Sequence, residues 1–63
     1  MPGQLSQKEL TLLQDQINNE RLLVAKFNSY AAQTTDPQIR AMCQQIAQRH
    51  QQHYNTLIQF LGQ

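Results

Sequence analysis

Two apolar stripes of helical period, separated by one proline-containing break, constrain most strongly what this 63-residue chain can fold into. Their members are spaced alternately three and four residues apart, which places each stripe on one face of an α-helix. The first stripe consists of Leu10, Leu13, Ile17, Glu20, Val24, Phe27 and Ala31. The second consists of Ile39, Cys43, Ile46, His50, His53, Leu57 and Phe60. The pattern predicts an all-α protein built from two long helices.

The signals at the helix ends agree with these stripes. Ser6 followed by Glu9 is the pattern of a capping box, which predicts a first helix over about 7–33. Asp36 precedes Pro37 as an N-cap precedes the first helical position, and Gly62 stands where a helix commonly ends. The second helix is therefore predicted over about 37–61, within a single domain of residues 1–63.

The short break between the two helices predicts an antiparallel hairpin with its turn centred near Thr35. Residues whose numbers sum to about 70 then lie opposite each other. Further apolar residues beside the stripes are Leu12, Leu22, Leu23, Tyr30, Met42, Tyr54, Ile58 and Leu61. One partner helix cannot cover so wide a surface, so we expect a homodimer that forms a ferritin-like four-helix bundle.

Three polar residues interrupt the stripes, and the hairpin places them together at its middle. Glu20 faces His50, while His53 lies one turn further along the second helix and opposite Ile17. Buried polar groups persist when they satisfy one another or bind a metal. The three residues are therefore either a structural layer that fixes the register or a site for Zn, Fe or Mn. A rotation of the helix that exposes one or both histidines is a third interpretation.

Composition argues against several functions. Charged residues make up only 14% of the chain, with five basic and four acidic side chains, so we expect no nucleic-acid partner. No apolar run approaches the ~20 residues of a membrane span, so we expect no membrane partner. The first four residues, Met1 to Gln4, lack the basic and apolar parts of a signal peptide. A single cysteine, Cys43, predicts a small buried side chain in a reducing compartment.

No glycine-rich phosphate loop and no nucleophile with an evident base occurs in the sequence, so we expect no enzyme, with a degenerate di-metal oxidase left open. Glutamine is the commonest residue and forms helices without adding charge. Such weakly charged surfaces repel copies of themselves poorly, which suits a protein that packs densely among neighbours.

Three segments together resemble the coat F family of spore coat proteins, over roughly residues 10–61. They are Asn19 to Ala32 (NERLLVAKFNSYAA), Thr35 to Pro37 (TDP) and Gln45 to Asn55 (QIAQRHQQHYN). The resemblance implies a ferritin-like fold and a protein of endospore-forming bacteria, found in the cytoplasm or in the coat of the forming spore. It also implies other spore coat proteins as partners.

The resemblance bears on the polar residues as well. By position, Glu20 matches the first-helix glutamate of ferritin-like proteins, and His53 matches the histidine of their Glu-x-x-His motif. His50 stands where that motif has glutamate, and Phe27 stands where many relatives have tyrosine, which argues against di-iron redox chemistry.

Three hypotheses about function follow. The first is a structural or interaction protein of the coat F type, and the second is a metal-binding bundle with Glu20, His50 and His53 as ligands. The third, an RNA-binding hairpin dimer, rests on analogy of fold alone and conflicts with the near-neutral charge.

Overall fold

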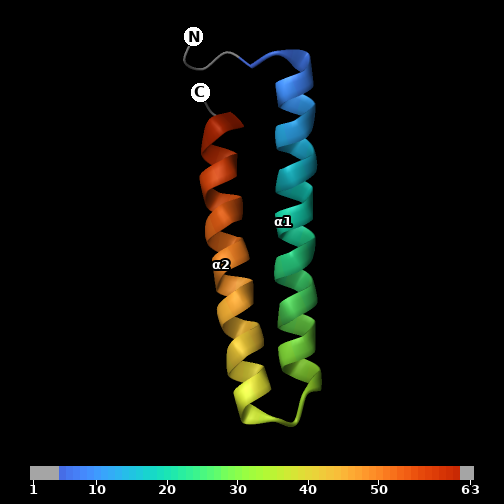
Figure 1. Ribbon diagram of the computed structural model, residues 1–63, viewed down its shortest axis with the longest axis vertical. Coiled ribbons are helices and arrows are strands. Elements are labelled where there is room, and N and C mark those ends of the chain that lie inside the picture. Colours follow the sequence, from blue (N-terminus) through green and yellow to red (C-terminus); the bar gives the residue numbers. More distant parts are fainter. Residues whose placement is uncertain (1–4, 62–63) are drawn as a thin grey trace.

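The computed structural model describes residues 5–61, which form two antiparallel α-helices joined by a short loop (Figure 1). Helix α1 spans Gln7–Gln33 and helix α2 spans Pro37–Leu61, which confirms the predicted hairpin and its bounds. The helices lie side by side along their length in a rod of 48 × 15 × 11 Å. The predicted helix end at Gly62 lies outside the described residues.

The capping box at the start of α1 is formed as predicted. The Ser6 hydroxyl accepts a hydrogen bond from the backbone N–H of Glu9 at 3.1 Å. The Glu9 carboxylate in turn accepts from the backbone N–H of Ser6 at 3.0 Å. These hydrogen bonds favour the charged carboxylate and so lower the pKa of Glu9.

The loop holds the second helix in place through side-chain hydrogen bonds. The Asp36 carboxylate accepts from the backbone N–H groups of Gln38 at 2.8 Å and Ile39 at 3.3 Å, which confirms Asp36 as the N-cap of α2. The Thr34 hydroxyl accepts from the backbone N–H of Asp36 at 3.1 Å. The direction of α2 is therefore set within three residues of the end of α1.

Replacing the cap of α2 tests this account. We expect Asp36→Ala to lower the free energy of unfolding by about 1 kcal/mol, because two backbone N–H groups lose their acceptor. Asp36→Asn keeps a side-chain oxygen at the same place and should stay close to the parent. Urea unfolding at one fixed protein concentration measures both variants, and equal losses in the two would contradict the capping role.

The predicted stripe of α1 is the surface that faces α2. All seven of its members are buried or half-buried, among them Ile17 at 8% exposure and Ala31 at 5%. The α1 stripe is therefore confirmed.

The predicted stripe of α2 is only partly correct. Cys43 is buried as predicted, but Ile39 and Phe60 are 44% and 50% exposed in the hairpin. Ala47, which lies outside the predicted stripe, is only 4% exposed. A methyl side chain at a helix contact lets two backbones approach closely, so α2 turns Ala47 toward α1 and leaves the two larger residues at the edge.

The hairpin does not enclose a core of its own. Among residues 5–61, no large side chain is fully buried, and the buried apolar residues are Ile17, Ala31, Cys43 and Ala47. The exposed large apolar residues are Leu5, Leu12, Leu22, Tyr30, Ile39, Met42, Ile58, Phe60 and Leu61. A single hairpin therefore leaves much of its apolar surface in water.

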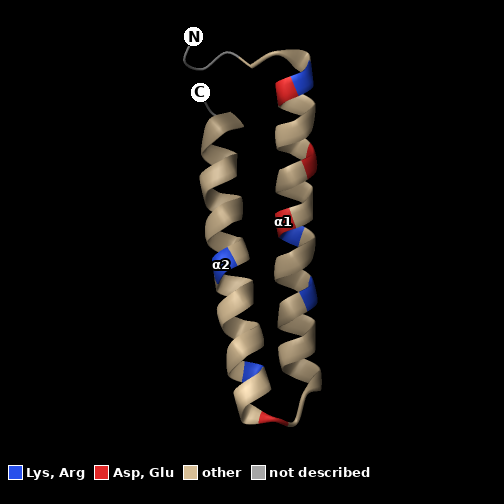
Figure 2. Cartoon of the chain, viewed as in Figure 1, with Lys and Arg blue, Asp and Glu red and all other residues tan. Residues whose placement is uncertain are grey.

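Charge is sparse on this rod, as Figure 2 shows. Helix α2 carries only Arg40 and Arg49 as permanently charged side chains, and no acidic residue. Electrostatic repulsion between two copies of α2 is correspondingly weak.

Candidate metal-binding site

The polar residues lie at the midpoint of the hairpin. Glu20 is the central residue of α1, which runs from 7 to 33, and His50 lies next to the centre of α2, which runs from 37 to 61. Glu20 is buried at 7% exposure. The side chain of His50 is 24% exposed and that of His53 is 59% exposed. The site therefore passes from a buried carboxylate to an imidazole that meets solvent.

Glu20 contacts both histidines. His50 Nδ1 lies 2.6 Å from Glu20 Oε1, a short hydrogen bond between the helices. His53 Nδ1 lies 3.5 Å from the other carboxylate oxygen, Oε2. One carboxylate thus faces the Nδ1 atom of each of two imidazoles that are one helical turn apart.

Neighbouring aromatic rings hold the imidazoles in position. The ring of Phe27 stacks on that of His50, with centroids 6.2 Å apart and planes at 16°. The rings of His50 and His53 meet edge to face at 5.6 Å and 84°. His50 is fixed by a hydrogen bond and by packing, so its orientation is defined before any ligand binds.

Opposing effects act on the pKa of Glu20. Burial raises it, because the charged form loses hydration. The hydrogen bonds from His50 and Gln16 and the charges of the two imidazoles lower it, and together they prevail, so the pKa of Glu20 lies below its ordinary value.

This shift predicts a loss of stability in acid. A carboxyl group with a lower pKa in the folded state stabilises the fold fully above the pKa of the unfolded chain, about 4.3 for glutamate. That contribution disappears as the pH falls through the lower, folded value. We expect the unfolding free energy of metal-free protein to decline below about pH 4.3, with a smaller decline in Glu20→Gln. Urea titrations between pH 7 and pH 3 measure both, and an identical decline in the variant would contradict the role of Glu20.

The three residues also form a set of metal donors. One ligand atom from each of Glu20, His50 and His53 can be chosen so that all three lie within 4.8 Å of one another. Imidazole and carboxylate donors suit Zn, Fe and Mn. The sequence prediction that these residues come together, as a group able to hold a metal ion, is confirmed.

One member of the cluster was not predicted. The side-chain amide of Gln16 donates to Glu20 Oε2 at 3.1 Å, which completes the surroundings of the carboxylate. The signal for it was the spacing, since residues four apart on a helix are neighbours. The prediction also placed His53 opposite Ile17 within the helix contact, whereas its side chain is exposed and its Nδ1 approaches Glu20.

These features define a helical hairpin with a Glu/His/His cluster at its centre. No protein-family model matches the chain, and no curated protein or solved structure matches it either. Within residues 5–61, neither helix has an apolar stretch long enough to cross a membrane.

Proposed function

We propose that the chain is a structural or interaction protein that works as a homodimeric, ferritin-like four-helix bundle. The observation that carries the proposal is the exposed apolar surface of the single hairpin, in which no large side chain is fully buried among the described residues. Chains of this size are marginally stable alone and often depend on association. A second copy of the same chain is the simplest partner that covers this surface.

One flank of the hairpin is suited to this contact. On α1, Leu23 follows Leu12 by 11 residues and Tyr30 follows Leu23 by seven. On α2, His53 follows Met42 by 11 residues and Phe60 follows His53 by seven. Eleven and seven residues are close to whole numbers of helical turns, so each set shares one direction.

The two sets lie on the same side of the hairpin. Gln16 is seven residues before Leu23, and Gln16 and His53 both approach Glu20 Oε2. Gln16 thus points in the same direction as the α1 set, and His53 belongs to the α2 set, so both sets lie on the side of the hairpin where Glu20 Oε2 lies. We call this side the apolar flank; its residues are Leu12, Leu23, Tyr30, Met42, His53 and Phe60.

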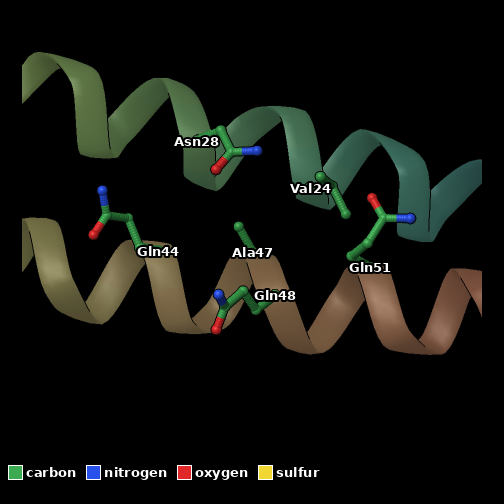
Figure 3. Close-up of a pocket in the computed structure, with 6 residues that line it drawn as sticks. All are labelled: Val24, Asn28, Gln44, Ala47, Gln48 and Gln51. Carbon is green, nitrogen blue, oxygen red and sulfur yellow. The ribbon is translucent and has the colours of Figure 1, made fainter.

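The opposite flank is polar at its middle. Figure 3 shows a depression lined by the amide side chains of Asn28, Gln44, Gln48 and Gln51 together with Val24 and Ala47. Amides hydrogen-bond water well, so this side has less to gain from burial. The contrast between the flanks supports the apolar flank as the dimer surface.

The size of the surface is sufficient. The broad face of the rod measures 48 by 15 Å between Cα atoms, so complete overlap buries roughly 700 Å² per copy, against about 800 Å² per partner in a standard interface. Sedimentation equilibrium tests the proposal. We expect the mass of two chains at micromolar concentration, and a folded single chain throughout the range would contradict it.

The resemblance to coat F proteins supports a place for this dimer in the spore coat, with other coat proteins as neighbours. The amide-rich, weakly charged exterior suits dense packing, because it offers many hydrogen-bonding groups and little repulsion. Immunogold labelling of sporulating cells that produce the chain tests this assignment. Label over the coat layers is expected, and label confined to the mother-cell cytoplasm at all stages would contradict it.

Metal binding is a second candidate function, and the donor set of Glu20, His50 and His53 favours it. A bound divalent ion stabilises the folded state by mass action, because the donors come together only on folding. We expect protein purified without added metal to contain Zn, Fe or Mn by elemental analysis. Its melting temperature should fall on treatment with a chelator. Absence of all three metals, together with no chelator effect, would contradict this function.

A further inference from the structure

We propose that two copies of the chain share one divalent metal ion, which four imidazoles bind, His50 and His53 from each copy, while Glu20 positions the imidazoles without binding the ion. The proposal rests on the dimer and on the metal binding proposed above, and it adds the ligands, the stoichiometry and the role of the carboxylate.

The contacts of Glu20 indicate the positioning role. Its two oxygens face the Nδ1 atoms of His50 and His53. Metal-binding histidines commonly donate one ring N–H to a carboxylate, which fixes the tautomer and leaves the other nitrogen for the metal. A proton on each Nδ1 leaves each Nε2 as a lone-pair donor, and within residues 5–61 neither Nε2 has a hydrogen-bond partner.

One hairpin supplies only half of such a site. Two Nε2 donors fall short of the four ligands that a closed zinc site requires. His53 lies on the apolar flank, and its side chain is 59% exposed. It borders an open depression lined by Gln16, Glu20, Thr56 and Leu57. In a closed site the missing donors approach from outside the hairpin, on the side where we place the second copy.

Symmetry brings the missing donors to the right level. Two hairpins that overlap fully on the apolar flank can be related by a two-fold axis along the rod or by one across it. An axis along the rod keeps every residue at its own level. An axis across the rod exchanges the two ends, but Glu20 lies at the midpoint of α1 and His50 next to that of α2, so both stay near the centre. With the axis along the rod, the two copies of α2 lie diagonally across the bundle, so His50 and His53 lie at the same level as the partner's His50 and the partner's His53 on the other side of the axis. With the axis across the rod, His53, four residues past the midpoint of α2, is carried away from its counterpart, so the shared site requires the axis along the rod.

The charges balance as well. Four neutral imidazoles leave the charge of a divalent ion uncompensated in the interior of the bundle. Two Glu20 carboxylates, one from each copy, bring the total to zero, and each is already buried within reach of the ligands. Buried charges that are neutralised in this way carry a much smaller desolvation penalty.

A zinc titration of the full-length chain, stripped of metal with a chelator and then dialysed, tests the proposal. Native mass spectrometry and calorimetry should give one Zn²⁺ per two chains. Sedimentation velocity should show the dimer dissociation constant falling by at least tenfold when Zn²⁺ is added. X-ray absorption at the zinc edge should show a first shell of four nitrogen atoms of imidazole type.

Variants separate the ligands from the positioning residue. His53→Ala should remove the zinc-dependent tightening of the dimer. Gln52→Ala, a change at the exposed neighbouring residue, should leave that tightening unchanged. Glu20→Gln keeps an oxygen that can accept from Nδ1–H, so the ratio of one ion per two chains should persist with affinity lowered 10- to 100-fold. Glu20→Ala should bind more weakly still.

The contrary results are distinct from one another. One ion per chain on a monomer, or a carboxylate oxygen in the first shell, would overturn the shared site but leave metal binding intact. A dimer of unchanged affinity that binds no zinc would overturn it and leave the homodimer intact. A monomer that binds no zinc would overturn the homodimer and the shared site together.

Discussion

Leu12→Glu is expected to convert the proposed dimer into monomers, raising the dimer dissociation constant by roughly 100-fold or more. Leu12 lies on the apolar flank and is 60% exposed in the single hairpin, so the change leaves the helix contact within one chain intact. In a two-fold dimer each substitution occurs twice and places two carboxylates against apolar surface. Sedimentation velocity over a dilution series measures the effect.

Leu22→Glu provides the matched control. Leu22 is on the same helix, is 66% exposed and undergoes the same chemical change. Ten residues separate it from Leu12, which turns it by about 80°, away from the flank and toward the outer side of α1. We expect its dissociation constant to stay within about threefold of the parent. Equal weakening by both variants would show that the apolar flank is not the dimer surface.

The largest expected loss of stability comes from replacing only one partner of the Glu20–His50 pair. His50→Leu removes the short hydrogen bond to Glu20 and leaves a buried carboxylate without its principal partner. Breaking a buried ion pair in this way costs about 3 kcal/mol, a substantial fraction of the total for a small domain. Urea unfolding of metal-free protein, at a single protein concentration, measures the loss.

The corresponding double variant should behave in the opposite way. Glu20→Leu combined with His50→Leu removes both polar groups and puts apolar side chains at the centre of the helix contact. Buried ion pairs replaced by apolar residues are often neutral or stabilising, so we expect the double variant to lie within about 1 kcal/mol of the parent or above it. A loss as large as that of His50→Leu alone would contradict this reading of the pair.

Most of the fold could be predicted from the sequence because its determinants are local. The capping box at Ser6 and the Asp36-Pro37 cap set the starts of both helices, and both were confirmed by hydrogen bonds. The pairing of Glu20 with His50 also followed, since a three-residue loop leaves only one register for two long antiparallel helices.

The exact rotation of α2 could not be predicted in the same way. Ile46 and Ala47 both lie near the helix contact, and the apolar pattern favours the larger residue. Close packing favours the smaller one, because the distance between two helices depends on the side chains at the crossing. The rotation that buries Ala47 also moves Ile39 and Phe60 to the edge, so one misjudged contact accounts for all three errors.

The predicted cluster brings together the three residues that the structure brings together, but the sequence did not reveal how their side chains are oriented. Spacing alone brings three polar residues to one level, but it does not reveal which ring nitrogen faces the carboxylate. That orientation depends on χ angles and on neighbours such as Phe27 and Gln16. Side-chain geometry was therefore needed before we could propose that Glu20 positions the two imidazoles and does not bind the ion.

The central location of the cluster has a consequence for how long an ion stays bound. Helices open first at their ends, and residues 20 and 50 lie at or next to the midpoints of their helices. Local fraying therefore does not uncover the donors, and an ion held between two copies escapes only when the copies separate. The residence time of the metal should equal the lifetime of the dimer, and a colorimetric chelator should extract zinc at a rate independent of chelator concentration.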